Sequence, residues 1–215
     1  MSIRRKQDLC LDAIEHSFSM ARIAYERVVH YCRQQHEDTT TPHLDDAMVL
    51  DAWSFVDVVK RLRSVLQNTP GLKQRAQALI DFLVETETIP DFRNHVQHIE
   101  DKTAAVADTG RPIWGSFSWV TLDSNGKNFK ICLYVPGRIA KTKAIPVVNP
   151  AGRQFHDDVD HFEMTIGATT INVSDMSCRI EAFRQRFEAA VKAALPKPIG
   201  PGETIMVIDL DSVPP

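Results

Sequence analysis

The spacing of apolar residues changes once along the chain, and this change separates a helical half from a half of strands. Between residues 11 and 32, apolar side chains recur at steps of three and four, which is the period of one face of an α-helix. The members of this stripe are Leu11, Ile14, Phe18, Ala21, Tyr25, Val28 and Cys32. We therefore expect a helix of about six turns that buries one face.

Three further helices are expected in the first half. A second apolar stripe runs from Met48 to Leu66 and stops at the sequence NTPG, whose proline and glycine disfavour a helix. A third helix is expected around residues 72–83, with Leu72, Ala76, Leu79 and Leu83 on its apolar side. Pro90 can open a fourth, because the missing N–H of proline costs nothing in the first turn. Four amphipathic helices with short connections predict an antiparallel four-helix bundle in a first domain at residues 1–106.

Beyond residue 112 the apolar period becomes two, which indicates β-strands. The stretches IWGSFSWVTL (113–122) and NFKICLYV (128–135) flank an Asn-Gly pair at residues 125–126. Asn-Gly between alternating segments is a strong signal for a tight hairpin. A two-residue turn would place Leu122 opposite Phe129 and leave Phe117, Trp119 and Tyr134 on the other face.

The remainder of the sequence predicts further strands, which would form one small sheet with the first hairpin. A second hairpin is expected at HFEMTIGATTINV (161–173), followed by a helix at about 175–195 with Ser174 as its cap and by a last strand, TIMVIDL (204–210). The second domain, at residues 112–215, is thus predicted to be a small antiparallel sheet covered on one face by one helix. The fold class of the whole chain is α+β.

Composition and cysteine usage narrow the possible functions. The 215 residues are 43% hydrophobic and 25% charged with a formal net charge of -3, so no global field favours nucleic acid or membranes. No apolar run is long enough to span a membrane, and we expect a cytoplasmic protein. The four cysteines form no CxxC pair. The acidic stretch His156–His161 alternates between two faces of a strand, and therefore neither a metal nor a cofactor is predicted.

Candidate chemistry lies in the sequence FRNHVQH, at residues 92–98. Arg93 is followed by Asn94 and, four residues later, by His98. This pattern resembles the HEPN superfamily, in which an arginine and a histidine are separated by about four to six residues on a late helix of a helical bundle. The resemblance covers the first half of the chain, and nothing in the second half adds to it.

The resemblance implies a metal-independent endoribonuclease. In that role His98 would act as acid or base on the ribose 2′-OH or on the leaving 5′-oxygen. Arg93 would hold the scissile phosphate, and Asn94 would orient the same group. One motif supplies half of an acid and base pair, so the resemblance also implies a homodimer through the fourth helix.

Two other interpretations of the same residues stay open. The fourth helix could be an amphipathic surface helix whose polar side chains are solvated. Alternatively, the chain could be a non-catalytic dimeric module that recognises a nucleotide or a regulatory partner protein. His95 lies on a different side of the helix from His98, which leaves open which histidine acts.

A basic segment follows in the second half, since residues 124–156 contain no acidic residue. Lys127 and Lys130 are close in sequence to the aromatic residues Trp119 and Tyr134. Basic side chains beside exposed aromatic rings can bind single-stranded RNA, so these four residues are candidates for substrate binding. In the alternative interpretation, the aromatic rings are packed and the basic segment is solvated.

Overall fold

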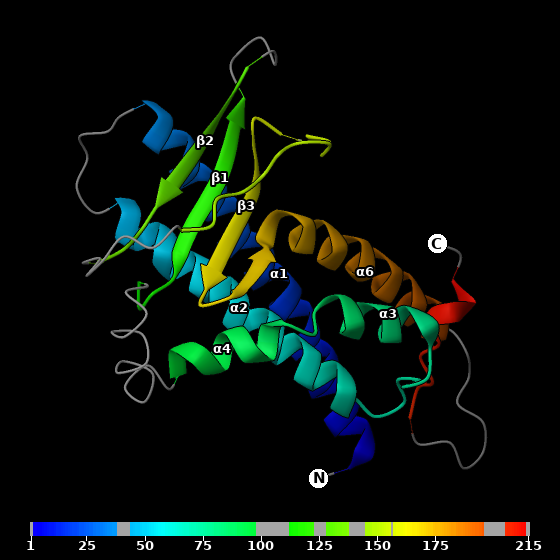
Figure 1. The fold of residues 1–215 in the computed structure, drawn as a ribbon. Coiled ribbons are helices and arrows are strands. Elements are labelled where there is room, and N and C mark those ends of the chain that lie inside the picture. Colours follow the sequence, from blue (N-terminus) through cyan, green and yellow to red (C-terminus); the bar gives the residue numbers. More distant parts are fainter. Residues whose placement is uncertain are drawn as a thin grey trace. The chain divides into compact units, whose positions relative to one another are not determined.

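A computed structural model of the protein describes seven stretches of the chain, drawn in colour in Figure 1: residues 2–37, 44–97, 112–122, 128–137, 145–155, 157–195 and 205–213. Helices are combined with one four-stranded antiparallel sheet, which confirms the predicted mixture of both. A four-helix N-terminal bundle is not confirmed as a separate body.

The contacts within the chain group it into two compact units. Unit 1 comprises Met1–Arg22, Asp57–Glu87 and Met176–Pro215, and unit 2 comprises Ile23–Val56 and Thr88–Asp175. Both units take segments from both halves of the sequence. The domain boundary between residues 106 and 112 stays a prediction, because residues 98–111 lie outside the described residues.

The helices bury the stripes that the apolar spacing predicts. They are α1 (Ile3–Glu37), α2 (Leu44–Asn68), α3 (Gln77–Glu85), α4 (Ile89–Gln97) and α6 (Val173–Ala194). Every member of the α2 stripe is fully buried: Met48, Ala52, Phe55, Val59, Leu62 and Leu66. Pro90 lies in the first turn of α4, where a proline is tolerated.

The sheet has the strand order β2-β1-β3-β4, with every neighbouring pair antiparallel. The strands are β1 (Ser116–Leu122), β2 (Phe129–Tyr134), β3 (Val159–Ile166) and β4 (Thr169–Asn172). Leu122 faces Phe129 in the first hairpin, as predicted from a two-residue turn. The turn itself lies outside the described residues.

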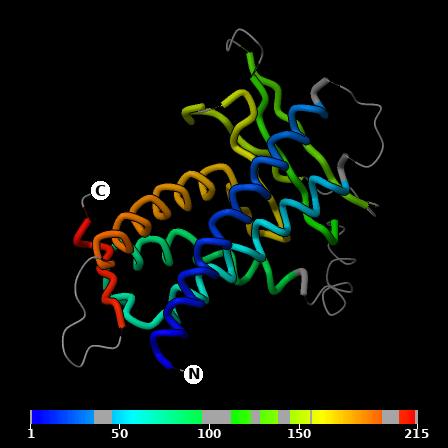
Figure 2. Tube along the Cα trace, turned by 180° about the vertical axis from the view of Figure 1, so that it is seen from behind, coloured from blue at the N-terminus to red at the C-terminus, as the bar shows by residue number. Residues whose placement is uncertain are grey.

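The two faces of the sheet have different neighbours within unit 2. One face carries Trp119 and Cys132, and it packs on the unit 2 parts of α1 and α2, which Figure 2 shows from behind the sheet. Burial raises the pKa of the Cys32 thiol of α1, and the nearby Cys132 raises it further. Segment 145–155 lies along the other face, where the N–H of Val148 donates to the Ser118 hydroxyl at 3.0 Å.

A β-bulge interrupts the ladder between β1 and β3. Ser118 faces Glu163 but Val120 faces Asp160, so β3 holds one extra residue. His161 takes a left-handed φ of +52° there. The N–H of Phe162 donates to the Ser174 hydroxyl at 2.9 Å, which corrects the expected role of Ser174 as the cap of α6. The cap is Asn172, whose side-chain oxygen accepts from the Asp175 N–H at 2.9 Å.

Helix α6 was expected to cover one face of the sheet, and that placement stays a prediction. From Met176 onward it belongs to unit 1. Its Phe183 ring stacks on Phe82 of α3, with centroids 4.3 Å apart, and lies 6.2 Å from the ring of Phe18 in α1. Within unit 1, the aromatic side of α6 therefore packs against other helices.

The expected last strand, at residues 204–210, is wrong. In the described residues 205–213, only Ile208 forms a bridge, which is parallel and isolated, to Leu72 of unit 1. The Ile208 N–H donates to the Gly71 carbonyl at 2.9 Å, and its carbonyl accepts from Lys73 at 3.0 Å. A short 3-10 helix, η1 (Leu210–Ser212), follows.

Gln7 of α1 fixes this C-terminal segment in unit 1. Its buried side-chain amide donates to the carbonyls of Pro70 at 3.0 Å and Met206 at 2.6 Å, and its oxygen accepts from the Met206 N–H at 3.0 Å. Gly71 has a φ of +77°, and a Cβ there would lie 2.1 Å from the Met206 carbonyl oxygen. Both the backbone angle and the close approach require glycine.

We expect Gln7→Glu to lower the free energy of unfolding by at least about 2 kcal/mol at pH 7. The substitution keeps the size of the side chain but turns a carboxylate oxygen toward two carbonyl oxygens. Urea denaturation followed by circular dichroism measures the change. Lys6→Glu, at an exposed neighbour, is the control and should change the value by less than about 0.5 kcal/mol. Equal values for both variants would contradict the role of Gln7.

Arg33 links α1 to the start of β3 within unit 2. Its Nε lies 2.9 and 3.0 Å from the two carboxylate oxygens of Asp158, and one terminal nitrogen lies 3.0 Å from Asp157. The hydrogen bonds from Arg33 lower the pKa of Asp158 well below its usual range. Two of the three carboxylates of the acidic stretch that could have held a cation, Asp157 and Asp158, thus bind an arginine.

Asp158→Asn should lower the free energy of unfolding by about 1 kcal/mol at neutral pH, because the pair is bidentate but partly exposed. The pKa of Asp158 is lower in the folded than in the unfolded chain. Its stabilisation is therefore complete above about pH 4 and is lost as the pH falls. Urea midpoints at pH 7 and pH 3 should show the gap between wild type and variant shrinking. Asp12→Asn is the control, and a gap that is the same at both pH values would refute the link.

Candidate functional site

The Arg-Asn pair lies on α4, which is anchored in unit 2 by one aromatic contact. Phe92 is buried, and its ring centroid lies 6.1 Å from that of Trp53 in α2. Its N–H donates to the Thr88 carbonyl at 3.1 Å in the first turn of the helix. Phe92 thereby fixes which side of α4 is buried, and with it the direction of the residues that follow.

Those residues spread over different sides of α4. Arg93 and His95 are half-buried, and Asn94 is exposed. Successive helical residues are rotated by about 100°, so the three side chains leave the helix in three directions. The Nε2 atom of His95 is shielded from solvent. His98 lies outside the described residues. The described part of α4 thus offers a guanidinium and an amide, both of which can bind a phosphate oxygen.

The second set of candidate residues divides by exposure. Lys130 is exposed on β2, opposite Thr121 of β1. Tyr134 is half-buried, and its ring lies 6.3 Å from that of Phe117. Lys127 lies outside the described residues. Substrate binding by this set stays a prediction.

Trp119 is only 4% exposed, and its ring stacks against that of Phe162 at a centroid distance of 6.2 Å. It lies on the sheet face that packs on the unit 2 helices. The ring has no open face in this structure on which a base could stack. Its packing matches the alternative interpretation in which the aromatic rings belong to the core.

If Trp119 is a core residue, Trp119→Ala should lower the free energy of unfolding by about 3 to 5 kcal/mol. Lys130→Ala should change it by less than about 0.5 kcal/mol, because the side chain is exposed. Chemical denaturation of both variants tests this. A Trp119 variant as stable as wild type would show that the indole is not part of the packing.

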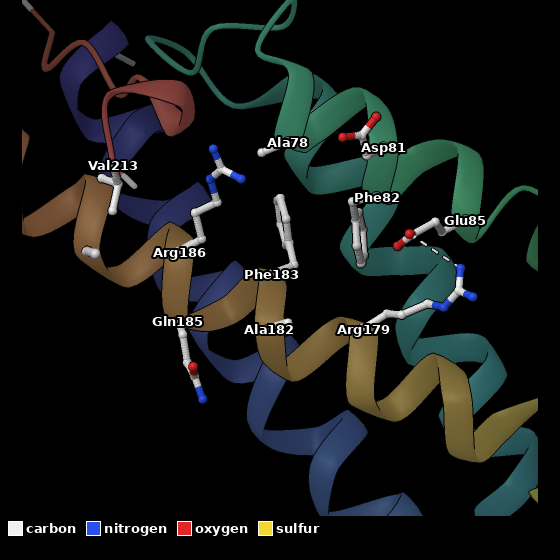
Figure 3. A pocket seen from close by; sticks show the side chains of 11 residues that line it. Ala78, Asp81, Phe82, Glu85, Arg179, Ala182, Phe183, Gln185, Arg186 and Val213 are labelled. Carbon is white, nitrogen blue, oxygen red and sulfur yellow. Dashed lines mark ion pairs between the residues drawn. The ribbon is translucent and has the colours of Figure 1, made fainter. Parts of the chain in front are cut away.

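A groove of about 510 Å³ lies between α3 and α6 of unit 1 (Figure 3). Its residues include three alanines, whose short side chains leave the space, two stacked phenylalanines and a mixed set of polar side chains. They are Ala78, Asp81, Phe82, Glu85, Arg179, Ala182, Phe183, Gln185, Arg186, Ala189 and Val213.

Charges of both signs border this groove. Arg179 of α6 and Glu85 of α3 form an ion pair at 3.4 Å, marked by the dashed line in Figure 3. The Nε of Arg186 donates to the Leu210 carbonyl at 3.0 Å, and its guanidinium lies 3.9 Å from the carboxylate of Asp211. Asp211 in turn accepts from the first N–H groups of α3, at 2.8 and 3.2 Å. Arg186 therefore supports the capping of α3 as well as bordering the groove.

The β-bulge contains a second unusual residue arrangement. His161 is buried, and neither ring nitrogen has a hydrogen-bond partner in the described structure. Its Nδ1 lies 3.9 Å from the carboxylate of Asp160, and the ring meets Phe155 edge-on at 5.1 Å. A left-handed non-glycine residue is a site of stored strain.

The described residues contain neither a candidate metal site nor a candidate membrane-spanning helix. In these ranges, no group of three or more His, Cys, Asp or Glu side chains is placed to hold a metal ion. The four cysteines, all within the described stretches, form no disulfide. Among the helices described, none has the length and apolar composition needed to cross a membrane.

Comparisons of the chain with protein family models, with curated proteins and with solved structures found no match.

Sequence reasoning missed the groove, the bulge and the Gln7 contacts. Ala182 and Ala189 are seven residues apart on one side of α6, so the spacing of small residues could have indicated the groove. Gln7 occupies the position four residues before Leu11, where the α1 stripe would hold an apolar residue. Nothing in the sequence around His161 indicates its left-handed backbone.

Proposed function

We propose that the protein is a HEPN-like endoribonuclease that cleaves single-stranded RNA without a metal, as a homodimer through α4. The observation that carries the proposal is the Arg93–Asn94 pair on a helix whose buried side is fixed by Phe92 against Trp53. The anchored helix gives the pair a defined place in unit 2. Asn94 is exposed, so a substrate phosphate can reach it.

Each residue of the motif has a separate chemical task in this proposal. Arg93 binds the scissile phosphate and offsets the charge that develops on its oxygens. Asn94 donates its amide to the same group. His98 removes the proton of the ribose 2′-OH or protonates the leaving 5′-oxygen, and the second copy supplies the partner acid or base. The products are a 2′,3′-cyclic phosphate and a free 5′-hydroxyl.

The proposal also takes the helices as a HEPN-like bundle. The helical part of the chain includes two long helices, α1 and α2, and the shorter α3 and α4. The sheet would then supply substrate contacts through Lys130 and Lys127, or would recognise a regulatory partner protein.

Cleavage of a mixed-sequence single-stranded RNA in EDTA tests the proposal. We expect the wild type to give products with 2′,3′-cyclic phosphate ends, and Arg93→Ala to be slower by at least about 100-fold. His98→Ala should lose the activity. Asn94→Ala should slow cleavage with little effect on stability, since the side chain is exposed.

Arg75→Ala is the matched control, because it removes an exposed arginine from unit 1 and should leave the rate unchanged. Circular dichroism must show that every variant is folded. Absence of cleavage by folded wild type, over a panel of RNA sequences, would reject the ribonuclease.

A second candidate function is binding without turnover, and the α3–α6 groove favours it. The groove combines apolar walls with arginine and carboxylate side chains, the mixture found in sites that bind small molecules or peptides. In the RNA cleavage experiment, this second candidate function predicts folded protein that binds RNA or nucleotide and leaves it uncleaved.

A further inference from the structure

Strand β2 carries a row of half-exposed apolar side chains. Phe129, Ile131 and Leu133 are 52%, 46% and 44% exposed. Alternate residues of a strand lie on the same face, so these three stand side by side on one face of the sheet. Single exposed apolar residues are common, but a contiguous row on a strand marks a contact surface.

Strand β2 also lies at one edge of the sheet formed by the described strands. In the order β2-β1-β3-β4, β1 pairs with one side of β2, and no described strand pairs with the other. Edge strands are usually protected by proline, a bulge, charges or short length. The six residues of β2 include no proline, keep a regular register with β1, and carry one charge, that of Lys130.

The opposite edge of the sheet shows the protection that β2 lacks. Strand β4 has four residues, three of them polar, and continues directly into α6. Figure 1 shows β2 and the short β4 at the two ends of the sheet. The contrast indicates that β2, and not β4, is built to receive another strand.

We infer that β2 pairs antiparallel with β2 of a second copy of this chain, about a two-fold axis at Ile131. In an antiparallel pairing, the residue numbers of any two facing residues add up to the same value. This value must be even if the half-exposed side chains of both copies are to lie on the same face of the joined sheet. A centre at Ile131 brings Phe129 against the partner's Leu133 and Ile131 against the partner's Ile131. Lys130 then faces the partner's Cys132, so no like charges meet.

Neighbouring registers are less favourable. A centre at Lys130 would place two ammonium groups directly opposite each other, which is destabilising. A centre at Cys132 would pair Ile131 with the partner's Leu133 but leave Phe129 beyond the end of the paired strand. Only the centre at Ile131 covers all three half-exposed side chains with their counterparts.

This interface is separate from the α4 contact of the proposed ribonuclease. A chain with two different two-fold interfaces can close into a tetramer with dihedral symmetry. If both contacts form, breaking the β2 contact leaves a dimer. If only the β2 contact forms, breaking it leaves a monomer. In both cases the mass of the assembly falls by half, so the inference stands independently of RNA cleavage.

Light scattering coupled to size-exclusion chromatography tests the interface. Ile131→Asp places a carboxylate on the two-fold axis opposite its own copy, and we expect the mass of the assembly to fall by half. Leu50→Asp is the matched control, because Leu50 is an exposed apolar residue on α2 of the same unit. It should leave the mass unchanged, and thermal melts should show both variants folded.

Cross-linking tests the register without relying on a disruptive variant. In a background with Cys10, Cys132 and Cys178 changed to serine, Ile131→Cys should give a covalent dimer on mild oxidation. Phe129→Cys should not, because equivalent residues would then be four positions apart, about 13 Å along the strand, and a disulfide needs Cα atoms within about 7 Å. The pair Phe129→Cys and Leu133→Cys together should cross-link again.

An unchanged mass for folded Ile131→Asp would overturn the inference, as would a monomeric wild type at micromolar concentration. Cross-linking of Phe129→Cys alone, or of native Cys132, would overturn the register. Arg93→Ala is expected to lose cleavage and keep the Ile131 cross-link, so failure of the ribonuclease proposal and failure of the β2 contact are read from different measurements.

Discussion

Three of the hydrogen bonds of the Gln7 amide, those to Pro70 and Met206, are the constraint on which unit 1 depends. They join the first helix to the Pro70 carbonyl and to both backbone groups of Met206, although Gln7 and Met206 are 199 positions apart in sequence. A buried amide is stable only when its donors and acceptor are satisfied, so its partners cannot move without a large cost. With the C-terminal segment held there, Asp211 reaches the first turn of α3, whose own cap residue Ala76 offers no side-chain oxygen. One polar residue thus organises the end of the chain.

Local patterns predicted the elements well, and distant contacts explain what they missed. The α2 stripe and the register of the first hairpin follow from periodicity and turn chemistry, which act over a few residues. The absence of a strand at TIMVIDL does not follow from local patterns, because Ile208 forms hydrogen bonds with Gly71 and Lys73 in a distant part of the sequence. The same holds for α6, which was expected as a helix but whose aromatic partners Phe82 and Phe18 were not predicted.

The candidate site shows the same division. The helical placement of Arg93 and Asn94 followed from Pro90 and the position of Phe92, and the structure agrees with it. Which face of the sheet stays accessible could not be read from alternation, because alternation separates two faces without saying which is covered. The face with Trp119 is packed, whereas on the other face Val120 of β1 is buried and Ile131 of the edge strand β2 is 46% exposed. Exposure depends on the helices and loops that arrive from elsewhere in the chain.

The interleaved composition of the two units has a genetic consequence. The chain passes from one unit to the other inside α1, inside α2, after Glu87 and within the first turn of α6. No continuous fragment holds a whole unit without residues of the other. Neither unit can therefore be moved into another protein by a single gene fusion, and the pair must be inherited, duplicated or lost together.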